Sequence, residues 1–179
     1  MKRTLVLLLT LCCISVAFGQ DKEVAVLNPK ITGGTVKETD KLIIVSSMKK
    51  AFTQIDGYKA FTRQSQELID AEAEFQRSGK VPDALIKKIG QQTAASYICT
   101  FTLASDGNEL VVNSDIIDVV GGEIIKSDLI NILNRNDRND VMEQCQSLAY
   151  SLLGASHSDG NVKQPIAKRH PAEPEMISV

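Results

Sequence analysis

The stretch YICTFTLASDGNELVVNSDIIDVVGGEIIKS, residues 97–127, decides the fold of this chain. Two turn signals, Asp106-Gly107 and Gly121-Gly122, divide it into three apolar runs of strand length. An Asp-Gly pair between apolar runs is a strong signal for a hairpin. The stretch therefore predicts three consecutive antiparallel strands: Tyr97–Leu103, Glu109–Val120 and Glu123–Ser127.

Upstream of this stretch, strand and helix patterns alternate. Val36–Ile55 places apolar residues at three- and four-residue spacing, which is the stripe of an amphipathic helix. A short apolar run, Glu23–Leu27, precedes it and an aromatic run, Tyr58–Thr62, follows it, and both are typical of strands. Ser65 is placed to cap a second helix, and Pro82 to begin a third.

Downstream, Asp140 and Glu143 have the spacing of a capping pair at the start of a last helix, which Gly154 would end. The full order is then β-α-β-α-α-β-β-β-α. This order predicts an α/β (α+β) fold with a mixed sheet of about five strands and helices mainly on one face.

The N-terminus has the pattern of a secretory signal. Two basic residues precede an apolar run, Leu5–Phe18, which ends in the small-x-small pattern Ala17-Phe18-Gly19. This run is too short to cross a membrane, so we expect a signal peptide at 1–19. The alternative is a lipid attached to Cys12 or Cys13, which would anchor the chain in the outer membrane.

The remaining sequence divides into one domain and a tail. Residues 20–154 contain all the periodic segments, and we expect them to form a single domain. Residues 155–179 contain three prolines and little apolar periodicity, which predicts a disordered C-terminal tail.

Composition excludes some classes of partner. Hydrophobic residues make up 43% of the chain and charged residues 23%, which is typical of a globular protein. Removal of Lys2 and Arg3 with the signal peptide leaves 18 basic against 22 acidic side chains. A mildly acidic domain without a basic run is not expected to bind nucleic acid.

The sequence offers no apparatus for catalysis. The two histidines, His157 and His170, both lie in the predicted tail, where no rigid surround holds an imidazole. The glycine pairs Gly33-Gly34 and Gly121-Gly122 lack the Lys-Ser/Thr of a phosphate loop. We therefore expect no enzyme activity, no cofactor and no metal.

Only Cys99 and Cys145 remain after cleavage of the signal peptide. One interpretation is two buried free thiols that behave as small hydrophobic residues. The other is a disulfide, which an exported protein can form. Their spacing does not fit a structural zinc site.

Five short motifs resemble those of a known superfamily. In order they are Val24–Leu27, Phe61-Thr62-Arg63, Lys88-Ile89-Gly90, Ala94–Ile98 and Ile116–Ile124. The series resembles the curli-assembly CsgG-like superfamily, whose relatives include the LpoB activators of penicillin-binding proteins and the N-terminal domain of TolB. The resemblance covers Glu23–Gly154 and implies a TolB N-terminal-like fold.

Four positions in these motifs have a role that the sequence leaves open. As structural residues, Arg63 would end a strand, Gly90 would let a helix pack closely, and Asp118 and Gly122 would shape a strand turn. The alternative is that they contribute to binding.

The resemblance also implies a function. It indicates an exported, non-catalytic protein of the bacterial periplasm or outer membrane that assists assembly, secretion or cell-wall synthesis through contacts with envelope proteins. An exposed strand edge or a helix-free face of the sheet is the expected interface. Assembly as a homo-oligomer stays open, because the pore-forming relatives form rings. The alternative function is a periplasmic protein that binds a small ligand or a peptidoglycan fragment.

Overall fold

The computed structural model describes residues 21–61 and 65–155. The predicted signal peptide at 1–19, with Cys12 and Cys13, lies outside the described residues. Residues 156–179 of the predicted tail and the motif residue Arg63 also lie outside them. The expectations placed on these segments therefore remain predictions.

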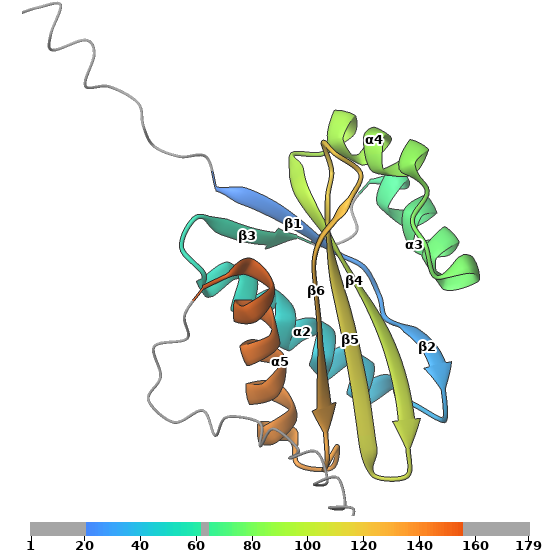
Figure 1. Ribbon diagram of the computed structural model, residues 1–179, viewed down its shortest axis with the longest axis vertical. Coiled ribbons are helices and arrows are strands. Elements are labelled where there is room, and N and C mark those ends of the chain that lie inside the picture. Colours follow the sequence, from blue (N-terminus) through green and yellow to red (C-terminus); the bar gives the residue numbers. More distant parts are fainter. Residues whose placement is uncertain (1–20, 62–64, 156–179) are drawn as a thin grey trace, which may run out of the picture.

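Six strands form one mixed sheet (Figure 1). Its order is β3-β1-β4-β5-β6, and β2 pairs with the same side of β4 as β1 does. The pairings of β1 with β3 and β4, and of β2 with β4, are parallel, whereas β4, β5 and β6 form the predicted antiparallel meander. The strands are β1 (Lys22–Val26), β2 (Lys30–Gly33), β3 (Tyr58–Phe61), β4 (Ala95–Asp106), β5 (Glu109–Asp118) and β6 (Ile124–Ile132).

The described helices cover the sheet in two pairs. Helices α2 (Glu38–Gln54) and α5 (Arg138–Leu153) pack on one face, while α3 (Gln66–Ser78) and α4 (Asp83–Gln92) pack on one end of the other. Strand β1 separates the two cores by alternation: Val24 and Val26 lie in the first, Ala25 and Leu27 in the second. The predicted fold class, an α/β (α+β) chain with a mixed sheet, is confirmed.

Two features of the fold differ from the sequence prediction. Strand β2 is a sixth strand, and its sequence KITG has one apolar residue, Ile31, so it carries no periodic signal. Pro29 has no N–H to donate, and it lies where β1 ends and β2 begins. The second feature is the position of the α3–α4 pair: the sequence predicted helices mainly on one face, whereas this pair buries Leu68, Phe75 and Ile89 on the other face.

Side chains fix two helix starts. Ser65 Oγ accepts a hydrogen bond from the Leu68 N–H (3.3 Å), so the predicted cap of α3 is confirmed. The predicted capping pair of Asp140 and Glu143 is wrong, because α5 begins earlier. The carboxylate of Asp137 accepts hydrogen bonds from two backbone N–H groups of the first turn (3.0 and 3.3 Å), which makes Asp137 the N-cap.

Candidate functional site

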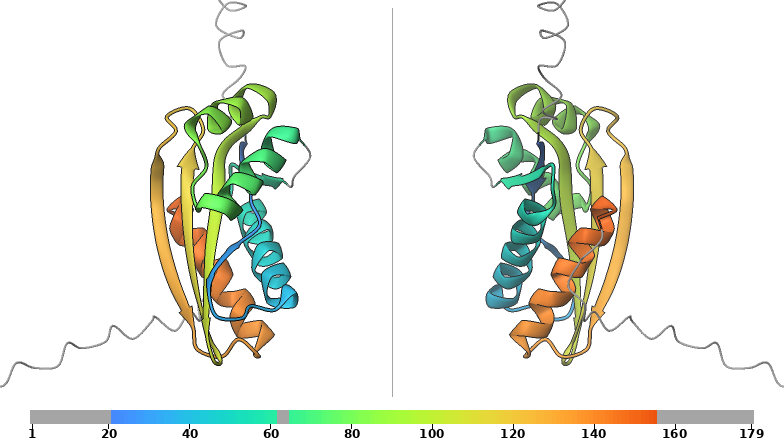
Figure 2. Two further views of the ribbon diagram at one scale, coloured as in Figure 1. Left: turned by 90° about the vertical axis from the view of Figure 1, so that its right-hand side faces the viewer. Right: turned by 90° about the vertical axis from the view of Figure 1, so that its left-hand side faces the viewer.

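The outer side of β6, which we call the β6 edge, is the longest open edge among the described strands. β6 pairs with β5 alone within the described residues, and it forms the outer boundary of the sheet in both views of Figure 2. The other outer strands, β2 and β3, have four residues each, whereas β6 has nine. A long unpaired edge presents a row of backbone N–H and C=O groups to any strand that can add to it.

The β6 edge also carries exposed apolar side chains. Ile124, Ile125 and Leu129 are 61%, 53% and 55% exposed, and Ile132 is the one buried residue of the strand. Leu133, directly after the strand, is exposed as well. Apolar side chains next to unpaired backbone groups are the two features that a docking strand uses for affinity and specificity.

The helix-free part of the sheet adjoins this edge. It consists of the ends of β4, β5 and β6 that have no described helix in front of them in Figure 1. Its side chains are mostly polar: the Ser127 hydroxyl donates to Asp115 Oδ1 (2.5 Å), and the Asn131 amide donates to Glu109 Oε2 (3.4 Å). A polar face is typical of the solvated side of an antiparallel sheet. Leu129 projects from this same face between Ser127 and Asn131, so the apolar contacts lie at its margin, next to the open backbone groups of β6, and the β6 edge is the stronger candidate.

Sequence reasoning located β6 but ended it too early. The predicted strand stops at Ser127, whereas the observed strand runs to Ile132 and includes Leu129. The second half of β6 places the polar Asp128 on its more buried face and the apolar Leu129 on its exposed face, so its sequence lacks the apolar alternation that extends a prediction. The available signal was the isoleucine content of IIKSDLINI, since β-branched residues favour strands.

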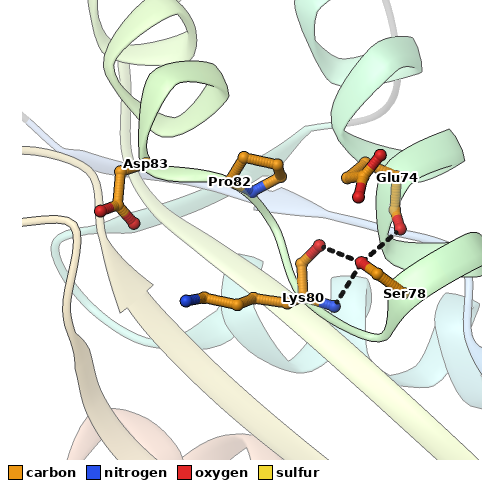
Figure 3. A pocket seen from close by; sticks show the side chains of 5 residues that line it. All are labelled: Glu74, Ser78, Lys80, Pro82 and Asp83. Atoms are coloured by element: carbon orange, nitrogen blue, oxygen red, sulfur yellow. Dashed lines mark hydrogen bonds between the residues drawn. The ribbon is translucent and has the colours of Figure 1, made fainter.

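A small depression lies where α3 leads into α4 (Figure 3). Glu74, Ser78, Lys80, Pro82 and Asp83 line it, and its volume is about 340 Å³. The Ser78 hydroxyl already bonds to three backbone groups, since it donates toward the Glu74 and Lys80 carbonyls and accepts from the Lys80 N–H. These bonds stabilise the turn, and the open shape offers no enclosed site for a reacting group.

A larger depression of about 550 Å³ lies between the start of α2 and helix α3. The buried carboxylate of Glu72 accepts a hydrogen bond from the Asn28 amide (2.7 Å) at its wall. Partial burial lowers the pKa of Lys49 on the opposite wall, and the charge of Glu72 opposes that shift. Two cations and two anions line the depression: Lys41 and Glu38 form an exposed ion pair at its rim, and Lys49 and Glu72 are partly desolvated.

The structure places three of the four motif residues in structural contacts. A Cβ atom added to Gly90 would come within 2.5 Å of Val119 Cγ1, so α4 packs as closely as the sequence predicted for this glycine. Asp118 Oδ2 accepts from the Gly121 N–H (2.6 Å), and the Asp118 carbonyl accepts from the Gly122 N–H (2.8 Å). Gly122 has φ +73°, which favours glycine, so these residues together form the turn between β5 and β6.

Cys99 and Cys145 are free, buried thiols in the structure. Both belong to the core beneath α2 and α5, and the Cys99 Sγ lies 3.3 Å from the Ser114 hydroxyl. Burial raises the pKa of each thiol to about 12. At neutral pH neither group is a thiolate, so neither has the form that a nucleophile or a metal ligand requires.

The described ranges, 21–61 and 65–155, contain neither a membrane-spanning helix nor a cluster of metal-binding side chains. No helix there is long and apolar enough to cross a membrane. No group of three or more His, Cys, Asp or Glu side chains there is placed to hold a metal ion.

The fold is similar to those of several solved structures. The hypothetical protein CT253 from Chlamydia trachomatis has a TM-score of 0.50 at 11% identity, over 75% of this chain and 94% of that one. The C-terminal domain of LpoB from Salmonella enterica has a TM-score of 0.45 at 14% identity, over 70% and 92%. TolB from Acinetobacter baumannii has a TM-score of 0.48 at 11% identity, over 75% and 28%.

LpoB and TolB, which the sequence motifs resemble, are thus among the solved structures that this fold is similar to. At identities of 11–14%, these comparisons carry no activity over to this chain. No family model and no curated protein matches the sequence.

Proposed function

We propose that this chain is an exported, non-catalytic protein of the bacterial envelope that assists assembly, secretion or cell-wall synthesis by binding other proteins. The observation that supports this proposal most directly is the β6 edge, a nine-residue open strand with exposed Ile124, Ile125 and Leu129. Binding by strand addition needs only an open edge and side-chain contacts, so it requires no catalytic side chain.

The proposal includes a place in the cell. Residues 1–19 act as a cleaved signal peptide, and residues 20–154 form the working domain in the periplasm. Attachment of a lipid at Cys12 or Cys13 is the alternative, and it would hold the same domain at the outer membrane. Mass spectrometry of the N-terminal peptide after cell fractionation separates these two outcomes: a start at Gln20, as glutamine or as pyroglutamate, in the soluble periplasm supports the first, and a lipid-modified start at either cysteine contradicts it.

The binding role is tested with two matched variants of the mature chain. Leu129→Lys changes an exposed leucine on β6, and Leu42→Lys changes an exposed leucine on α2, which is 71% exposed. Both leave the cores intact, so both should fold. We expect the wild type and Leu42→Lys to retain the same protein from an envelope extract, and Leu129→Lys to lose it. Equal retention by both variants, or no retained protein at all, would contradict the proposal.

The depression between α2 and α3 supports a second candidate function, which is binding of a small zwitterionic ligand such as a peptidoglycan fragment. Lys49 and Glu72 provide opposite charges for a carboxylate and an ammonium group in a partly desolvated setting. Titration with muropeptides, followed by amide chemical shifts, tests it. Shifts confined to residues of this depression, such as Asn28 and Gln76, support the candidate, and an unchanged spectrum removes it.

A further inference from the structure

The centre of β6 is complementary to a second, antiparallel copy of itself. The seven residues from Ile124 to Ile130 are IIKSDLI: two apolar residues, a base, a serine, an acid and two apolar residues. Ser127 is the midpoint of this pattern. Reversal of the strand exchanges Lys126 with Asp128 and Ile125 with Leu129, so base meets acid and apolar meets apolar.

The geometry of antiparallel pairing makes this pattern meaningful. Two identical antiparallel strands that share an edge are related by a two-fold axis perpendicular to the sheet, and the axis passes between one residue and its own copy. Opposite residues then lie on the same face. With the axis at Ser127, each Lys126 lies opposite Asp128 of the second copy. Ile125 follows as the neighbour of Leu129 of the second copy, although a register shift of β6 against β5 falls at this residue.

Neighbouring registers lack this match. An axis at Lys126 places two lysines opposite each other, and an axis at Asp128 places two aspartates opposite each other. Directly opposed like charges destabilise a strand pair, whereas opposite charges and apolar pairs stabilise it. Of these three registers, the one centred on Ser127 is the one that satisfies both charges.

We infer that a second copy of this chain occupies the β6 edge, paired antiparallel about Ser127, to form a two-fold dimer with one continuous sheet. The inference rests on the proposed function, because it names the protein that fills the proposed interface. The dimer covers Ile125 and Leu129 of both copies, and it pairs the backbone groups that the single chain leaves open.

The contacts around Lys126 and Asp128 in the single chain fit this assembly. The backbone of Lys126 pairs with Ile116 of β5, whereas its exposed side chain has no hydrogen bond or ion pair with another described residue. Asp128 Oδ1 accepts a hydrogen bond from the Leu129 N–H (2.8 Å), so a side chain serves a backbone donor of the strand. Asp128 Oδ2 accepts from the Ser151 hydroxyl on α5. In the dimer, the Leu129 N–H is free to pair with the second copy while Asp128 turns toward Lys126 of the second copy.

The expected dimer is weak. A contact through one strand edge buries less surface than the roughly 1,200 Å² at which stable interfaces begin. We therefore expect a dissociation constant on the order of micromolar, and a molar mass that rises with concentration in light scattering.

Exchange of the two charges tests the register. Lys126→Asp places one aspartate opposite each Asp128, and Asp128→Lys places one lysine opposite each Lys126, so each single variant creates two like-charge pairs in the dimer. We expect each single variant to weaken the dimer by about tenfold, since two cross-strand pairs turn from attractive to repulsive. The double variant K126D/D128K restores opposite charges, and we expect it to recover most of the affinity. A double variant as weak as the singles, or singles equal to the wild type, would overturn the inference.

Cross-linking tests the position of the axis. Ser127→Cys places two thiols opposite each other, and mild oxidation should join two chains. Asn131→Cys, exposed on the same strand, is the matched control, because its copy would lie roughly 25 Å away along the strand. The native Cys99 and Cys145 are buried and give little background. Equal cross-linking of both variants, or none with Ser127→Cys, would contradict the dimer.

Two further outcomes separate this inference from the proposed function. A wild-type chain that stays monomeric at high concentration, and dimerises once residues 156–179 are removed, overturns the inference. A chain that stays monomeric but retains an envelope protein through Leu129 also overturns it, while the proposed function stands. A dimer with the expected charge response supports the inference even where no other envelope protein is retained.

Discussion

Replacement of Gly90 by alanine tests how closely α4 packs against the end of β5. The added Cβ would lie 2.5 Å from Val119 Cγ1. Ordinary carbon contacts are about 3.5–4.0 Å long, so α4 or Val119 must move by roughly 1 Å. Val119 is buried, and a valine side chain has little rotational freedom, so the movement has a cost.

Two opposing effects set the size of the change. Overpacking of a core costs about 1–3 kcal/mol. Alanine is favoured over glycine in a helix interior by about 1 kcal/mol, and Gly90 lies within α4. We therefore expect Gly90→Ala to lower the free energy of unfolding by roughly 1 kcal/mol, and Tm by about 2–4 °C.

The same substitution in a Val119→Ala background should have the opposite sign. Val119→Ala alone removes the clashing methyl group and should cost about 2 kcal/mol through lost burial. Without that methyl group, Gly90→Ala keeps its helix advantage and should raise stability by up to about 1 kcal/mol. Urea unfolding of the four chains, followed by circular dichroism, completes the double-mutant cycle. The same effect of Gly90→Ala in both backgrounds would refute the close contact.

Two other substitutions test the fold. Asp137→Ala removes the N-cap of α5 and should lower the free energy of unfolding by about 1 kcal/mol, more than Asp140→Ala does. A larger effect of Asp140→Ala in thermal unfolding would instead support the capping pair predicted from the sequence. Burial raises the pKa of Cys99 and Cys145 from 9.0 to about 12, so the stability that the neutral thiols contribute is full below pH 9 and is lost as pH rises toward 12. Between pH 8 and pH 10 the wild type should lose about 2–3 kcal/mol more than C99A/C145A in urea unfolding. Equal losses would show that the thiols are not buried as neutral groups.

The sequence was informative wherever one side of an element is buried. Ile44, Met48 and Phe52 repeat at helical spacing because one side of α2 packs against the core, and all three are buried. The hairpin between β4 and β5 was visible because Asp106-Gly107 separates two apolar runs, and β4 ends at Asp106 in the structure.

The sequence did not predict elements that are weakly buried, or contacts between elements that are far apart in the chain. β2 has one apolar residue, and in the second half of β6 the exposed Leu129 and the half-buried Asp128 reverse the usual pattern, so no apolar alternation marked either segment. Periodicity shows which side of α3 is buried, through Leu68 and Phe75, but it does not show which face of the sheet receives that side. The β6 edge could be expected as a class of interface, but its position required the strand order, which depends on pairings between residues far apart in the sequence.

In-cell photo-cross-linking along β6 tests the central claim most directly. A photoreactive residue placed at Ile125 or Leu129 samples the β6 edge, and one placed at the exposed Lys50 on α2 samples a surface outside it. We predict cross-links to protein at both β6 positions, either to a second copy or to another envelope protein, and none at Lys50. A chain that forms no cross-link from β6, or that cross-links equally from all three positions, would contradict a protein that works through this edge.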